Sequence, residues 1–189
     1  MSNNIIKNLG IFINNSAEFN SILGNDCIMS GDFVLFSLNK SDENINKSKY
    51  NSMLSIYLSS EKKEDIVLFM LLNNFSNYKG KYIKVVNTNV LVTTLHITTD
   101  PVNKLNEQNI LNIQKVYFDG KDVIYLHPRD SLLKSEKIKE NTPINTKQLE
   151  FYKSLGYSFE YKNILRKESS LYNNIQYLRY KYSKEKLKD

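Results

Sequence analysis

The chain has 189 residues, 41% of them apolar, and a net charge of +6, which suits one domain with a hydrophobic core. It contains 25 Asn and 23 Lys but only three Arg and one Ala. This bias towards AT-rich codons indicates an AT-rich genome, such as that of a virus, phage, mobile element, parasite or reduced bacterium. Because mutation pressure alone can raise the Lys count, total charge does not identify a partner.

The distribution of charge is more informative than its total. Residues 1–161 hold 18 basic and 17 acidic side chains, whereas residues 162–189 hold eight basic and three acidic ones. We therefore expect a single α+β domain over residues 1–165 and a basic C-terminal helix or tail over 166–189. Such a segment attracts polyanions or acidic surfaces, or it is a solvated helix that keeps the protein in solution.

The cysteine count and the apolar runs indicate the cellular compartment in which the protein is expected. Cys27 is the only cysteine, so no intrachain disulfide is possible. The first residues lack a secretory pattern, and the longest apolar run, Ile66–Leu72, is too short to span a bilayer. We expect a soluble intracellular protein without a membrane segment, or an effector exported without a cleaved signal.

Apolar spacing predicts the elements of the first half. Residues 5–23 predict one amphipathic helix or a broken pair. Strands are expected at Phe33–Leu38 and Met53–Leu58, paired across the polar loop Asn39–Asn51. Glu61–Asn74 fits either a buried helix or a central strand, and its acidic first turn favours the helix.

In the second half, strands are expected at Tyr82–Val86 and Val90–Thr98, joined by a short turn. Pro101 opens a helix whose apolar residues recur as far as Tyr117, and Asp122–His127 forms the next strand. Four further elements complete the prediction: a loop with a short helical piece over Ser131–Thr142, a helix over Thr146–Leu155 ended by Gly156, a strand over Tyr157–Tyr161, and an amphipathic helix from about Ser169.

This order of elements predicts a mixed sheet. A strand, a helix and another strand require a crossover, so Val90–Thr98 and Asp122–His127 are expected to be parallel neighbours. The earlier strands are expected to be antiparallel. The predicted fold class is α+β, with a mixed, mainly antiparallel sheet flanked by helices.

One motif follows the last predicted crossover. Asn145 precedes Tyr152 by seven residues, and the helix continues as Phe151-Tyr152-Lys153-Ser154-Leu155-Gly156-Tyr157. Together with the element order, residues of about 88–161 resemble the second half of a GNAT-type N-acetyltransferase. The resemblance implies transfer of an acetyl group from acetyl-CoA to an amine, which could belong to a protein.

The resemblance also implies roles for single residues. Tyr152 would protonate the leaving thiolate, Asn145 would hold the cofactor or the helix, and the backbone at Leu95 and Ile97 would bind pantetheine. His96 is a candidate base for the amine, or a satisfied core or surface histidine. The segment that corresponds to the family's glycine-rich pyrophosphate loop, Thr99–Asn109, contains no glycine.

A competing hypothesis comes from the C-terminal segment. Four tyrosines there interleave with cations, and aromatic rings among cations can stack on bases while the charges meet phosphates. On this reading the chain is a non-enzymatic viral, phage or effector protein that binds nucleic acid or a host protein. The segment could equally dock on the domain. The cations proposed to bind are Arg179, Lys181, Lys184 and Lys186.

Other groupings are possible from residue type alone. Cys27 could join His96 and Asp100, or His127 and Asp130, in a thiol triad, or it could be a buried small apolar residue. One Cys and two His exclude a usual His/Cys zinc site. Asp119, Asp122 and Asp130 could collect Mg²⁺ or could form turns.

Overall fold

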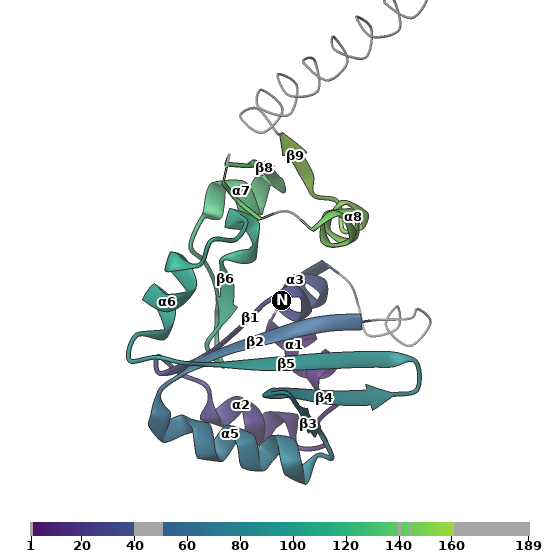
Figure 1. Cartoon of the computed structure of the whole chain (residues 1–189), viewed down its shortest axis with the longest axis vertical. Coiled ribbons are helices and arrows are strands. Elements are labelled where there is room, and N and C mark those ends of the chain that lie inside the picture. The colour runs from purple at the N-terminus through teal and green to yellow at the C-terminus, as the bar shows by residue number, and fades with distance from the viewer. Residues whose placement is uncertain (1, 40–50, 140, 144, 161–189) are drawn as a thin grey trace, which may run out of the picture. The chain divides into compact units, whose positions relative to one another are not determined.

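A computed structural model describes residues 2–39, 51–139, 141–143 and 145–160. The chain forms two compact units, Met1–Leu133 (unit 1) and Lys134–Asp189 (unit 2) (Figure 1). The domain boundary expected between residues 165 and 166 lies outside the described residues. Among the described residues, no helix combines the length and the apolar character needed to cross a membrane.

Unit 1 is built on a sheet of seven strands in the order β3-β4-β5-β2-β1-β6-β7. The pair β2–β5 is parallel and the other five pairs are antiparallel. The predicted α+β class with a mixed, mainly antiparallel sheet is therefore confirmed. The strands are β1 (Cys27–Ser30), β2 (Asn51–Leu58), β3 (Ser76–Tyr78), β4 (Lys81–Val86), β5 (Asn89–Ile97), β6 (Val116–Phe118) and β7 (Val123–Tyr125).

The predicted parallel pairing of Val90–Thr98 with Asp122–His127 is wrong. β5 lies between β4 and β2, whereas β7 is the far edge strand, antiparallel to β6. The parallel partner of β5 is β2, and the chain between them forms α5 (Ser60–Leu72) and the β3–β4 hairpin. A crossover does join two parallel strands, β2 and β5, but it precedes β5 in the chain, whereas the prediction placed it after β5.

The apolar run Phe33–Leu38 forms a helix, not the predicted strand. It lies in α3 (Asp32–Asn39), where Phe33, Val34, Leu35 and Phe36 are all buried. A run that is apolar on every side fits a buried helix as well as a buried strand. The partner of β2 is consequently β1, not this segment.

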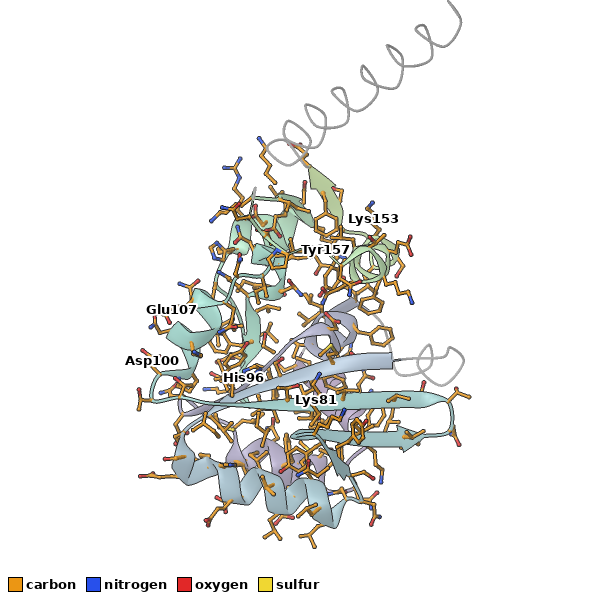
Figure 2. All side chains as sticks on the ribbon, viewed as in Figure 1. Lys81, His96, Asp100, Glu107, Lys153 and Tyr157 are labelled. Carbon is orange, nitrogen blue, oxygen red and sulfur yellow. The ribbon has the colours of Figure 1, made fainter. Side chains whose placement is uncertain are left out.

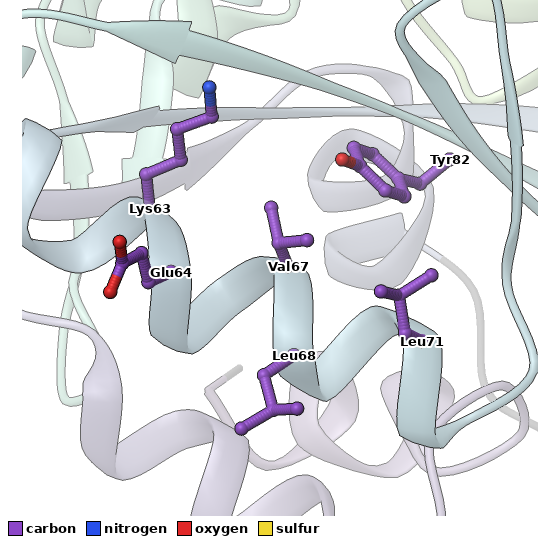
Figure 3. Close-up of a pocket in the computed structure, with 6 residues that line it drawn as sticks. All are labelled: Lys63, Glu64, Val67, Leu68, Leu71 and Tyr82. Carbon is purple, nitrogen blue, oxygen red and sulfur yellow. The ribbon is translucent and has the colours of Figure 1, made fainter.

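Side chains alternate between the two faces of the sheet. On one face Ile28 and Tyr57 pack with Leu105 of α6 (Pro101–Glu107). On the other face Tyr82 points towards α5 (Figure 3). Of the two alternatives for residues 5–23, one helix or a broken pair, the structure has the pair, α1 (Ser2–Leu9) and α2 (Ser16–Ile22). Phe19 of α2 meets Phe69 of α5 edge to face. The helix expected at 61–74 is also confirmed, as α5.

The helix that begins at Pro101 is shorter than predicted. It ends at Glu107, and Gln108 is extended. The apolar residues beyond it fall on a 3-10 turn, η1 (Asn112–Gln114), and on β6, where Ile113, Val116 and Phe118 are fully buried. The apolar residues of Ile110–Tyr117 are therefore spaced as in a helix although they belong to a 3-10 turn and a strand. α7 (Pro128–Leu133) ends unit 1.

The described part of unit 2 is a small strand–helix–strand motif. β8 (Ser135–Lys137) and β9 (Ser158–Glu160) are parallel, and α8 (Thr146–Ser154) joins them. The helix expected at 146–155 and the strand expected after Gly156 are confirmed, with Gly156 at φ +96°. The segment Ser131–Thr142, expected as a loop with a short helical piece, contains the end of α7 and also the unpredicted strand β8. The helix expected from Ser169 lies outside the described residues.

Candidate functional site

Tyr152 lies in the aromatic core of unit 2. Its side chain has no solvent exposure. Its ring centroid is 5.8 Å from that of Phe151 and 6.4 Å from those of Tyr157 and Phe159. A buried phenol stabilises the fold by apolar burial. To act as a general acid, its hydroxyl group would have to reach the atom that it protonates.

Asn145 is the N-cap of α8. Its side-chain oxygen accepts hydrogen bonds from the backbone N–H groups of Lys147, at 3.0 Å, and Gln148, at 3.3 Å. These are two of the helix donors that have no partner within the helix. The capping arrangement explains the spacing of the motif, because it fixes where the helix begins and hence which face carries Tyr152.

His96 lies on β5 in unit 1 (Figure 2). Its ring stacks on that of Tyr57, with centroids 4.4 Å apart and an interplanar angle of 11°. Burial, and secondarily the charge of Lys104, lowers the pKa of His96 below its usual value. The imidazole is therefore neutral at neutral pH, the form that a general base requires.

Leu95 and Ile97 lie on β5 where, among the described residues, one edge of that strand is open. Thr98 N–H donates to the Leu58 carbonyl, so the backbone groups of Leu95 and Ile97 point away from β2 by alternation. On that side β4 begins at Lys81, opposite Thr94, and no further strand in the described part of the chain pairs with β5 there. This stretch of backbone is the one that the acetyltransferase resemblance assigns to pantetheine.

The predicted catalytic set is divided between the two units. His96, Leu95 and Ile97 lie on β5 in unit 1, whereas Tyr152 lies in α8 and Asn145 caps that helix in unit 2.

The start of α6 carries a carboxylate where the resemblance places a pyrophosphate. Asp100 is the N-cap, and its Oδ1 accepts from the Asn103 N–H at 3.1 Å. Pro101 contributes no N–H at the first helical position. A negative side chain at this helix end repels a phosphate group, which agrees with the missing glycines in the sequence.

Cys27 is not placed for a triad with His96. It is fully buried, and burial raises the pKa of its thiol to about 12, with a further contribution from Asp26. It pairs with Leu58, whereas His96 pairs with the adjacent Tyr57, so the two side chains lie on opposite faces of the sheet. The parts of the chain that the structure describes contain no group of three or more His, Cys, Asp or Glu placed to hold a metal.

A groove that the sequence did not predict lies between α5 and β4 (Figure 3). Its volume is about 400 Å³, and its lining consists of Lys63, Glu64, Val67, Leu68, Leu71 and Tyr82. Leu68 and Leu71 are more than half exposed, and Leu72 is 71% exposed. The signal was present in the sequence, because Ile66–Leu72 holds more apolar residues than one buried face of a helix needs.

The four cations proposed for partner binding, Arg179, Lys181, Lys184 and Lys186, lie outside the described residues. The charge balance of the two units is nevertheless fixed by the sequence. Unit 1 has 13 basic and 13 acidic side chains, and unit 2 has 13 basic and seven acidic ones, so unit 2 carries the entire net charge of +6.

The sequence matches no known protein-family model and no curated protein.

Proposed function

We propose that this protein binds nucleic acid through the basic residues of unit 2, with unit 1 as its folded scaffold. The observation that carries the proposal is the charge partition, since unit 1 is neutral and unit 2 holds the whole excess of +6. Clustered positive charge is the electrostatic footprint of a nucleic-acid-binding protein. It attracts phosphate groups by releasing condensed counterions.

The distribution of residues within unit 2 supports the same ligand. Residues 162–189 hold eight of its 13 basic side chains and only three acidic ones. Tyrosines alternate with these cations at positions 172, 177, 180 and 182. Aromatic rings stack on bases in proteins that bind nucleic acid without strong sequence preference, so this composition fits a polynucleotide better than an acidic protein surface.

The test replaces Arg179, Lys181, Lys184 and Lys186 together by Gln in the full chain. Binding to fluorescein-labelled oligothymidylate is followed by fluorescence anisotropy over a range of salt concentrations. If all four residues contact phosphates, the slope of log affinity against log salt falls in magnitude by about 3, since each phosphate contact contributes about 0.7 for a single strand.

The control removes the same charge from unit 1. Gln replaces four exposed lysines there: Lys7, Lys63, Lys104 and Lys121. This variant should keep most of the salt dependence. Equal losses in the two variants would mean that only the total charge matters, and a wild-type protein that binds no oligonucleotide would overturn the proposal.

The acetyltransferase expectation is the second candidate. The edge of β5 at Leu95 and Ile97, which no strand of the described residues covers, favours it, because backbone groups there could bind an extended pantetheine arm. Tyr152, which is fully buried, and Asp100, which caps α6, argue against it. Isothermal titration calorimetry with acetyl-CoA decides the matter, and an absence of binding at millimolar cofactor would exclude this candidate.

A further inference from the structure

The β3–β4 hairpin of unit 1 has a fixed geometry. Its loop consists of Lys79 and Gly80, whose φ angles are +49° and +78°. Positive φ at both loop residues is typical of the tight turn that matches the twist of a hairpin. Asn77 Oδ1 accepts a hydrogen bond from the Gly80 N–H at 3.2 Å. The positions of the residues that flank the turn are therefore well defined.

An aromatic ring is held in solvent beside this turn. Tyr78 is 60% exposed although it is a large side chain in a strand. The Lys79 ammonium lies 5.3 Å from the centroid of its ring. Tyr78 pairs directly with Lys81, so their side chains project from the same face of the hairpin. The hairpin thus presents an exposed ring with one ammonium group over it and a second lysine on the same face.

The stretch of sequence around these cations is free of acidic residues. The sequence contains no Asp or Glu from Ile66 to Thr99, while it contains Lys79, Lys81 and Lys84. Lys84 Nζ donates to the Asn73 carbonyl, which leaves Lys79 and Lys81 as the outward charges. Within the described residues neither of these two lysines has a carboxylate partner.

We infer that this hairpin is a contact site for single-stranded nucleic acid. One base stacks on the exposed ring of Tyr78, while Lys79 and Lys81 meet the phosphates on either side of it. A duplex keeps its bases within the stack, so it can use the two lysines but not the ring. An acidic peptide would likewise use only the charges. The site therefore discriminates in favour of unpaired strands.

The inference rests on the proposed function, because it adds a second contact for the same class of ligand. The test compares Tyr78→Ala and Tyr78→Phe in the full chain, using labelled oligothymidylate and a labelled duplex. Tyr78→Ala should weaken oligothymidylate binding about tenfold and leave duplex binding within about twofold. Tyr78→Phe keeps the ring and should bind as the wild type does. Circular dichroism confirms that the exposed substitution leaves the fold intact.

Two outcomes would overturn this inference: an unchanged oligothymidylate affinity in Tyr78→Ala, or an equal loss for the duplex. Photocrosslinking to oligonucleotides that contain 5-bromouracil separates it from the proposed function. Crosslinks found only after residue 161 would support the basic segment and refute the hairpin. A crosslink at Tyr78 that persists in the four-residue Gln variant, together with unchanged salt dependence, would support the hairpin and refute the basic segment.

Discussion

The two units differ in how their residues are used. Unit 1 combines a seven-stranded sheet with 13 basic and 13 acidic side chains, so its charges cancel. The described part of unit 2 contains one helix and a pair of three-residue strands, yet unit 2 holds all of the net charge. Apolar burial and net charge are thus concentrated in different parts of the chain.

This difference separates the determinants of stability from those of affinity. Apolar burial is the main favourable term in folding and scales with the apolar area removed from water, whereas attraction to a polyanion depends on exposed charge and weakens as salt is added. Substitutions in the core of unit 1 should therefore change the free energy of unfolding, and those in the basic segment should change salt-dependent binding. The predictions below test this separation, from the largest expected effect to the smallest.

Replacing Phe33 by Ala should give the largest loss of stability. Phe33 is fully buried in α3, and truncating a buried aromatic side chain costs about 3–5 kcal/mol. Urea denaturation followed by circular dichroism measures the effect. The matched control is Leu72→Ala on the exposed side of α5, which should change stability by less than about 0.5 kcal/mol. A similar cost for both would mean that Leu72 is covered in solution.

In unit 2, Tyr152→Ala should lower stability by about 3 kcal/mol, because it removes a fully buried ring among three other aromatic side chains. Tyr152→Phe retains the ring and should cost about 1 kcal/mol or less. The same denaturation experiment measures both. If Tyr152→Phe lowered stability as much as Tyr152→Ala, the hydroxyl group rather than the ring would be essential at this position.

Two glycines with positive φ distinguish crowding from backbone strain. A Cβ at Gly31, φ +99°, would lie 2.8 Å from the Met53 carbonyl oxygen, whereas a Cβ at Gly80, φ +78°, meets no atom within 4 Å. Gly31→Ala should therefore destabilise the protein by about 2–3 kcal/mol, and Gly80→Ala by about 1 kcal/mol. Thermal unfolding compares the two, and equal effects would argue against the close packing of Gly31 against β2.

His96 should give the smallest effect, visible only as a dependence on pH. Because its pKa is lowered in the folded state, the unfolded chain binds this proton more readily. Its contribution is fully present above the unfolded pKa of about 6.5 and is lost as the pH falls through that value towards the folded pKa. Between about pH 7.5 and about pH 5.5, the Tm of the wild type should fall more than that of His96→Gln. Parallel curves would contradict the lowered pKa.

Local signals predicted the helices with capping residues or acidic first turns. Asn145 and Gly156 bracket α8 as expected, and the acidic first turn of α5 distinguished it from a strand. Asp32 lies in the first turn of α3 and is a comparable signal, but the compact apolar run after it led to a strand prediction. The helix expected over Thr146–Leu155 is confirmed as α8, whereas the burial of Tyr152 depends on what its side chain packs against.

The sequence by itself determined the partition of charge, the turn at Asn87-Thr88, and the bounds of α8. These features depend on residues within a few positions of one another. The tertiary structure alone decided that β5 pairs with β2, that Phe33–Leu38 is a helix, and that Cys27 and His96 lie on opposite faces of the sheet. Strand partners are distant in the chain, and which of them meet depends on how all the apolar faces are buried together.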